Sequence, residues 1–307
     1  MKKFGNITAL MLGAVLLVSG CGNSQPAVEL PPAAVSFVEE PAVSYLGPEG
    51  TYTEEAAKFF FSSKGSFVPE ETVDNAIAAA AAGKADYAVI PQENTLGGAV
   101  INYVDSLLSH DDVYVVGEVI IPISQTLMGI PGTTLADIRT VCSHAQGIKQ
   151  SEQWRSEYIP DAVTEEKSST AAAASYVAEL GDKSVAAVAA PGAAALYGLE
   201  VLAENVQITD TNKTRFYVLS KERMTGGTNA VFVISCEAKK LDDAIVFMEK
   251  CGVEPVSVHD RPEGSRLGMY NYIIEVESKN GITDDKIGRI CSELQARFLG
   301  SFNAVSK

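Results

Sequence analysis

The sequence predicts an α/β body followed by a smaller α+β unit. From Val43 onward, short β-branched runs alternate with alanine-rich stretches, a pattern typical of sheets with helical crossovers. A polar, glycine-containing connector at 221–228 interrupts this pattern, and a new strand begins at Asn229. The chain has 307 residues, 46% of them hydrophobic, which is enough to bury separate cores for the two parts.

The elements of the body follow from local signals. Strands are predicted at 43–46, 86–90, 113–116, 140–142 and 185–188, and helices at 74–82, around 100–109 and at 170–180. Glycines follow the first and last of these helices, because glycine readily takes the conformation that ends a helix. The second unit is predicted as strand, helix, strand, strand and helix, an order of the ferredoxin-like kind. These elements span 229–235, 241–251, 256–258, 271–276 and 283–298.

The N-terminus differs from the rest of the chain. Two lysines precede an uncharged apolar run at 7–18 that is too short to span a bilayer, which predicts a secretory signal peptide over 1–20. The run ends in Val-Ser-Gly-Cys21, which resembles the lipobox of bacterial lipoproteins, so Cys21 would carry the lipid. Residues 21–41 are rich in proline and alanine and would form a tether. We therefore expect an extracytoplasmic protein that is lipid-anchored to the bacterial cell membrane; the alternative is a plain signal peptide with an incidental cysteine.

Charge and composition exclude several functions. The net charge is -15, and it becomes about -17 without the two lysines of the signal, so nucleic acid is a poor partner. Beyond Cys21 the cysteines show no CxxC pair, and the three histidines form no HExxH motif, so no metal site is expected. An anionic small molecule would need local donors, such as an arginine or the N-terminus of a helix.

The segment Thr214-Arg215-Phe216 brings a hydroxyl and a guanidinium together at the end of a predicted strand. Arg215 has the fork geometry that holds a carboxylate, and Thr214 offers one mobile proton to a neighbouring oxygen. The alternative is a strand threonine beside an arginine in a surface ion pair.

Polar loops follow three of the predicted strands, which is where open α/β sheets place ligands. Residues 47–54 form a tight turn whose amides near Thr51 suit a carboxylate, or a turn that only caps a helix. Residues 91–98 place Glu93, Asn94 and Thr95 side by side, either for binding or as helix caps. Residues 143–147 begin with Ser143-His144, but without a GxSxG elbow a hydrolase is not expected.

Together these stretches resemble the prephenate dehydratase family, and the resemblance covers the chain from Val43 to its C-terminus. The shared motifs, as they stand here, are Gly47-Pro48-x-Gly50-Thr51 with Glu54, Glu93-Asn94 with Gly98 and Val100, Ser143-His144 with Gln146 and Gln150, Ser169-Thr170-Ala171, Ala195-x-Tyr197-Gly198-Leu199, and Asn212-x-Thr214-Arg215-Phe216.

The resemblance implies a catalytic domain over 42–222, with two α/β lobes arranged like those of periplasmic binding proteins and a substrate cleft between them. The unit 228–307 would be an ACT domain, and pairing of ACT units would give a homodimer. The reaction would be that of a carbon-oxygen lyase of phenylalanine biosynthesis. Prephenate would lose carbon dioxide and its ring hydroxyl to give phenylpyruvate, without metal or organic cofactor.

Site roles follow from the same motifs. Thr214 matches the family's essential threonine and would hydrogen-bond the departing hydroxyl. Arg215 and the amides near Thr51 and Thr95 would hold the substrate carboxylates. The other residues assigned to substrate binding are Phe216, Asn212, Glu93, Asn94, Ser143, Gln146, Ser169 and Thr170.

The chain departs from the family at several positions. Gln125 stands where a histidine is usual, Thr53 and Thr95 replace serines, and Ala145 replaces a proline. In the ACT unit, the Gly-Ala-Leu turn is replaced by residues 238–241, and only Arg261-Pro262 remains of a Glu-Ser-Arg-Pro motif. We therefore expect weak or absent phenylalanine feedback. Two other functions remain open: arogenate dehydration, or a non-catalytic surface lipoprotein that binds a small anionic metabolite.

Overall fold

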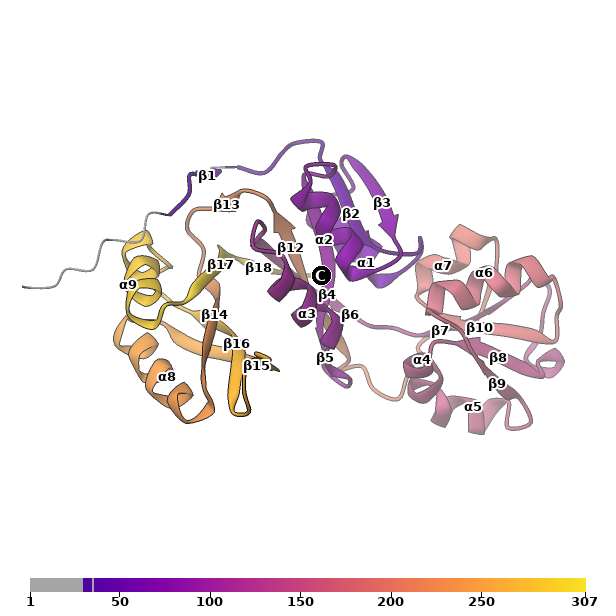
Figure 1. The fold of residues 1–307 in the computed structure, drawn as a ribbon. Coiled ribbons are helices and arrows are strands. Elements are labelled where there is room, and N and C mark those ends of the chain that lie inside the picture. Colours follow the sequence, from indigo (N-terminus) through magenta and orange to yellow (C-terminus); the bar gives the residue numbers. More distant parts are fainter. Residues whose placement is uncertain (1–29, 35) are drawn as a thin grey trace, which may run out of the picture.

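The computed structural model describes residues 30–34 and 36–307, which form two lobes and a C-terminal unit (Figure 1). The second lobe, drawn in pink, and the C-terminal unit, drawn in orange and yellow, lie on opposite sides of the first lobe. The expected signal peptide over 1–20 and the lipid-bearing Cys21 lie outside the described residues. In the part of the chain that the structure describes, no helix is long and apolar enough to cross a membrane.

The first lobe is built on a seven-stranded sheet of order β18-β6-β12-β4-β2-β3, with β5 beside β4. Helix α1 packs on one face of this sheet, and α2 and α3 pack on the other. The strands are β2 (Ala42–Leu46), β3 (Ser66–Glu70), β4 (Tyr87–Asn94), β5 (Gly98–Ala99), β6 (Tyr114–Pro122), β12 (Lys213–Ser220) and β18 (Ala304–Ser306). The helices are α1 (Tyr52–Phe60), α2 (Val73–Ala81) and α3 (Ile101–Ser109).

The second lobe has a five-stranded sheet of order β11-β7-β10-β8-β9. Its strands are β7 (Thr126–Gly129), β8 (Thr140–Ser143), β9 (Val163–Glu166), β10 (Val185–Ala189) and β11 (Glu200–Ala203). Its helices are α4 (Ala145–Gln150), α5 (Glu152–Tyr158), α6 (Thr170–Leu180) and α7 (Pro191–Tyr197), with a 3-10 turn, η1 (Leu135–Asp137).

Two chain crossings connect the lobes, at 123–125 and at 204–212, and they hydrogen-bond to each other. The Ile123 amide donates to the Asn212 carbonyl at 2.9 Å, and the Val206 amide donates to the Gln125 carbonyl at 2.9 Å. The chain therefore returns to the first lobe through β12, which carries Thr214.

The C-terminal unit has a four-stranded antiparallel sheet of order β15-β16-β14-β17. Its elements are β14 (Asn229–Glu237), η2 (Ala238–Lys240), α8 (Leu241–Lys250), β15 (Glu254–Pro262), β16 (Met269–Glu277), α9 (Asp284–Leu294) and β17 (Arg297–Phe302). Helices α8 and α9 cover one face. The other face shares a core with the first lobe, where Val231, Ile273 and Leu299 pack with Tyr217 and Leu219. The α/β class with a ferredoxin-like second unit is thus confirmed.

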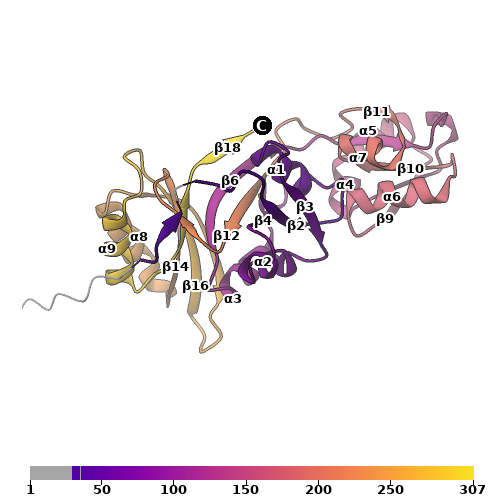
Figure 2. The ribbon, with the colours of Figure 1, turned by 90° about the horizontal axis from the view of Figure 1, so that it is seen from above.

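Some element boundaries differ from those predicted. The helix expected at 283–298 ends at Leu294, because Gln295 adopts a left-handed conformation (φ 51°) and residues 297–302 form strand β17. After this strand, β18 pairs in parallel with β6, so the end of the 228–307 unit lies in the first lobe's sheet (Figure 2). Near the other end of the chain, β1 (Ala33–Ala34) pairs with β13 (Arg223–Met224). The helix predicted at 170–180 matches α6 and ends at Gly181 in the left-handed conformation.

Candidate active site

Strands β4 and β12 carry the central residues of the site. They pair antiparallel, with Thr214 opposite Asn94 and Arg215 opposite Glu93. Successive side chains of a strand point to opposite faces of the sheet. Thr214 and Asn94 therefore face the second lobe, whereas Arg215 and Glu93 face the C-terminal unit.

Asn94 links the two lobes by its side-chain amide. Its Oδ1 accepts hydrogen bonds from the Leu96 amide at 3.0 Å, from the Gly97 amide at 2.9 Å and from Gln146 Nε2 at 2.7 Å. Because two of these donors are backbone amides, the orientation of the Asn94 side chain is determined. Its Nδ2 must then face Thr214, and it donates to Thr214 Oγ1 at 2.9 Å.

The Thr214 hydroxyl is fixed by one hydrogen bond and keeps its own proton available to donate. Its oxygen accepts from Asn94, and no described residue accepts its proton. A hydroxyl that accepts a fixed hydrogen bond still has one donor to aim elsewhere. Here that proton has access to a cavity of about 230 Å³, which Thr214 lines.

This cavity lies between the lobes, and its lining carries polar side chains but no charged ones. Its lining contains amides, hydroxyls and an imidazole, and no Asp, Glu, Lys or Arg of the described chain contributes to it. The lining residues are Tyr52, Asn94, Ile123, Gln125, His144, Gln146, Gly147, Gln150, Ser168, Ser169, Thr170 and Thr214.

The N-terminus of helix α6 lies at the cavity. Ser169 caps this eleven-residue helix by accepting from the Ala172 amide at 3.0 Å, and Ser168 and Thr170 also line the cavity. Amides of the first helical turn have no partners within the helix and favour anions. The N-terminus of α6 is therefore suited to a carboxylate.

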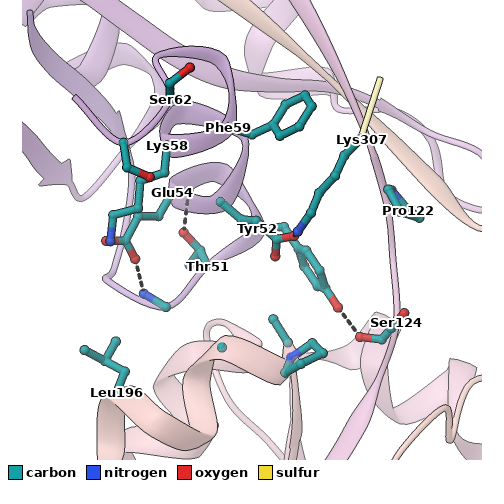
Figure 3. Close-up of a pocket in the computed structure, with 16 residues that line it drawn as sticks. Thr51, Tyr52, Glu54, Lys58, Phe59, Ser62, Pro122, Ser124, Leu196 and Lys307 are labelled. Carbon is teal, nitrogen blue, oxygen red and sulfur yellow. Dashed lines mark hydrogen bonds and ion pairs between the residues drawn. The ribbon is translucent and has the colours of Figure 1, made fainter. Parts of the chain in front are cut away.

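A larger cleft of about 840 Å³ adjoins the same region, between α1 and α7 (Figure 3). Figure 3 shows Tyr52 pointing from α1 toward Ser124, whose carbonyl accepts its hydroxyl proton. Burial raises the pKa of Tyr52, so the phenol stays protonated and can donate. The two lysines of this cleft are paired with glutamates of α1: Lys58 with Glu54 at 2.6 Å and Lys307 with Glu55 at 2.5 Å.

Arg215 does not line either opening, contrary to its expected role as a carboxylate ligand. Its guanidinium contacts Glu118, Glu275 and Glu93 instead. Strand alternation explains the difference, because Arg215 points away from the face that carries Thr214. Glu93, also expected at the substrate, pairs with Arg215 at 3.3 Å.

Four other residues that were expected to bind substrate have structural roles instead. Phe216 is 1% exposed in the core beneath α1. Ser143 is fully buried and donates to the Val188 carbonyl at 2.6 Å. The Thr95 amide and hydroxyl both donate to the Lys213 carbonyl, so this amide is not free for a carboxylate. Thr51 caps α1 and lines the larger cleft rather than the smaller cavity.

The remaining expected residues lie at or behind the cavity. Asn94, Gln146, Ser169, Thr170 and Thr214 line it. Asn212 lies behind Asn94, where its Oδ1 accepts from Asn94 Nδ2 at 2.8 Å.

Sequence reasoning missed several lining residues as ligands: Tyr52, Gln125, His144, Gln150 and Ser168. Gln125 is the most informative of them. It is 3% exposed and donates to Gln150 at 3.0 Å, and its own oxygen has no hydrogen-bond partner among the described residues. Buried polar atoms are usually paired in proteins, so this oxygen is an exception in a residue that lines the cavity.

The fold and the cavity define a two-lobed α/β protein with a cavity between the lobes that is lined by uncharged side chains, many of them polar. The model of one family, described as prephenate dehydratase, matches residues 43–224. The chain belongs to this prephenate dehydratase family. It is 31% identical over 277 residues to a prephenate dehydratase of Lactococcus lactis subsp. cremoris, covering 86% of this chain and 98% of that protein.

Two solved structures with a similar fold carry different descriptions. A prephenate dehydratase from Arthrobacter aurescens in complex with L-Phe has a TM-score of 0.77 and 29% identity, covering 85% of this chain and 89% of that one. A protein called GqqA, described as a novel type of quorum quenching acylase, has a TM-score of 0.75 and 28% identity, covering 86% and 98%.

The comparisons overturn the extracytoplasmic, lipid-anchored location expected from residues 1–21. The relative from Lactococcus lactis matches 86% of this chain and is described as a prephenate dehydratase, not as a surface lipoprotein. A small-residue and cysteine pattern after an apolar run is therefore an insufficient basis for that location.

The Ser143–His144 pair is not arranged for acyl transfer. Ser143 is fully buried and hydrogen-bonded to a backbone carbonyl, and His144 Nδ1 accepts from the Gln146 amide at 3.3 Å. The two side chains therefore form no nucleophile and base pair of the kind that acyl transfer uses.

Proposed function

We propose that this chain converts prephenate to phenylpyruvate, carbon dioxide and water in phenylalanine biosynthesis, as a carbon-oxygen lyase. Family membership supports the reaction, and the Asn94–Thr214 hydrogen bond is the observation that supports Thr214 as its catalytic residue. A protein that only binds a metabolite has no need of a donor aimed at a leaving group.

The chemistry requires little from the protein beyond position and one donor. Formation of the aromatic ring drives the loss of carbon dioxide and of the ring hydroxyl, which takes up a proton from solvent to leave as water. Thr214 would hydrogen-bond this hydroxyl as negative charge develops on its oxygen, while Asn94 holds the threonine oxygen in place. Since threonine is a weak acid, its contribution is that of a hydrogen-bond donor to the transition state.

The substrate carboxylates would be held by neutral groups of the second lobe. The first-turn amides of α6, with Ser169 and Thr170, take the role that sequence reasoning gave to Arg215. Gln146 would fix the distance between the lobes through Asn94. In the described part of the chain no group of His, Cys, Asp and Glu side chains is placed to hold a metal ion, and the proposal uses none.

Prephenate should be preferred to arogenate. Arogenate carries an ammonium group in place of the keto oxygen, and no described carboxylate lines the smaller cavity to pair with it. We expect kcat/KM for prephenate to exceed that for arogenate about 100-fold or more, the cost of about 3 kcal/mol for an unpaired buried charge. Product analysis with each substrate at matched concentrations measures this ratio, and a ratio near one would contradict the argument.

We also propose that 42–222 is the catalytic domain and that 228–307 is a divergent ACT-like domain that pairs with its copy to form a homodimer. The structure supports separate elements for the two, although they share a core. Sedimentation of the full chain at micromolar concentration tests the dimer, and a monomer there would contradict it.

Phenylalanine should inhibit weakly or not at all. Arg261, retained from the family motif, is engaged with Asp105 of α3 by two hydrogen bonds of 2.5 and 2.9 Å, and His259 contacts Tyr103. Binding of an amino acid there would have to displace these contacts. Isothermal titration of the full chain with L-phenylalanine should show no micromolar binding, and 1 mM phenylalanine, about a thousand-fold above that range, should leave the rate within about twofold. Micromolar binding with inhibition would contradict this expectation.

A further inference from the structure

We infer that Glu275 of the C-terminal unit is a positioning residue for catalysis, because it holds Arg215 and thereby the two strands that carry Thr214 and Asn94. This inference rests on the proposed function. It assigns a role to the face of the sheet opposite the cavity.

The cluster consists of one guanidinium among three carboxylates. Arg215 Nη2 contacts the two oxygens of Glu275 at 2.6 and 2.7 Å. Its Nε donates to Glu118 at 3.0 Å, and its Nη1 donates to Glu93 at 3.3 Å. Three elements of the first lobe, β12, β6 and β4, are thus tied to β16 of the C-terminal unit through a single side chain.

Two of the three carboxylates are buried, which restrains the geometry at Arg215. The side chains of Glu275 and Glu118 are 1% and 4% exposed, and that of Arg215 is 19% exposed. Burial alone would lower the pKa of Arg215, but the charges of Glu275 and Glu118 and their hydrogen bonds raise it, so the guanidinium stays charged. Burial also raises the pKa of Glu118.

Glu275 is itself held from a second side. The Tyr217 hydroxyl donates to Glu275 Oε2 at 2.8 Å, and Gln92 Nε2 donates to the Tyr217 oxygen at 3.2 Å. Gln92 occupies a bulge in the pairing of β4 with β12, where Arg215 faces Glu93 and Phe216 faces Pro91. Bulges re-aim side chains, and this one lies beside the Thr214–Asn94 pair.

The cluster around Arg215 connects directly to the catalytic site, because neighbouring residues on each of the two strands face opposite sides of the sheet. Arg215 adjoins Thr214 on β12, and Glu93 adjoins Asn94 on β4. A shift of Arg215 toward or away from Glu275 moves the backbone that carries the catalytic hydroxyl. A displacement of about 1 Å at a reacting group can cost about 100-fold in rate.

The excess of carboxylates around Arg215 makes it possible to distinguish a positioning role of Glu275 from a purely stabilising one. Arg215 has more carboxylates than it needs, so loss of one negative charge leaves it paired with Glu118 and Glu93. Glu275→Gln should therefore preserve the fold. Removal of an ordinary structural ion pair, by contrast, would lower the stability of the protein without a selective effect on kcat.

The test compares Glu275→Gln and Arg215→Lys with a control at the same interface. The control, Asp105→Asn, weakens the Arg261–Asp105 ion pair between β15 and α3, neither of which carries a residue that lines the cavity. For the full chain with prephenate, we expect kcat about tenfold lower for Glu275→Gln and for Arg215→Lys, with KM within about twofold. The control should keep both constants within about twofold of wild type.

A second readout does not depend on turnover. Hydrogen exchange of peptides covering 213–220 should be about tenfold faster in Glu275→Gln than in wild type and unchanged in Asp105→Asn. Wild-type values of both kcat and exchange in Glu275→Gln would overturn the inference. A KM raised about tenfold in Arg215→Lys at unchanged kcat would also overturn it, because Arg215 would then touch substrate. If wild type itself has no turnover, the proposed function fails, and the exchange rates still decide whether Glu275 holds β12.

Discussion

Replacing Thr214 with valine should lower kcat for prephenate about 1,000-fold, because the variant keeps the shape of the side chain and loses the donor aimed at the leaving hydroxyl, together with the oxygen that accepts from Asn94. Removal of one preorganised donor to a developing oxyanion costs about 3 to 4 kcal/mol in other enzymes. Thr214 is 9% exposed and makes its hydrogen bond with Asn94 alone among the described residues, so the fold should survive the change. Steady-state kinetics of phenylpyruvate formation measure the effect.

Thr214→Ser serves as the matched control for this prediction. It keeps the hydroxyl and loses one methyl group, so kcat should stay within about tenfold of wild type. A valine variant as active as the serine variant would show that the hydroxyl is not the donor. A serine variant as inactive as valine would assign the role to packing of the methyl group instead.

Asn94→Asp should lower kcat about 100-fold at pH 7 although it changes hardly any atoms' positions. The carboxylate oxygen that replaces Nδ2 would accept the Thr214 proton, whereas Asn94 donates to the threonine oxygen. The hydroxyl would then be directed away from substrate. Circular dichroism should match wild type, since the Leu96 and Gly97 amides keep an oxygen acceptor. Prephenate binding should weaken, because the new negative charge lies in the cavity that takes the substrate carboxylates.

The pH dependence of kcat for this variant tests the direction of the hydrogen bond between residue 94 and Thr214. Asn94 is 8% exposed, and burial raises the pKa of a carboxyl group. Protonation at low pH creates a donor that can again face the Thr214 oxygen, so activity relative to wild type should rise as pH falls. A ratio of variant to wild-type kcat that is flat between pH 5 and pH 8 would contradict the proposed direction of the hydrogen bond.

The amino-acid sequence predicts the parts of the site that depend on local order. Polar loops after strands 86–90 and 140–142 indicated Asn94 and Gln146, and the helix start at Ser169-Thr170 indicated the cap that opens onto the cavity. These residues lie where strand ends and helix starts place them, so neighbours in sequence are sufficient to find them.

Other features depend on pairing over long distances. Arg215 has partners 97 and 60 residues away in the sequence, at Glu118 and Glu275, and no local pattern predicts them. Strand alternation by itself separates Thr214 from Arg215, because adjacent residues of a strand face opposite sides of the sheet. Gln125 was seen only as a departure from the family, because its role depends on the second crossing, where Gln207 Oε1 accepts from the Gln125 amide at 2.8 Å.

Measurement of prephenate binding and prephenate turnover on the same samples of wild type and Thr214→Val tests the account most directly. We expect both chains to bind prephenate with dissociation constants that agree within about threefold, and only the wild type to form phenylpyruvate at an appreciable rate. Binding by the wild-type chain without product, or equal turnover by the two chains, would contradict the assignment of Thr214 as the donor to the leaving hydroxyl.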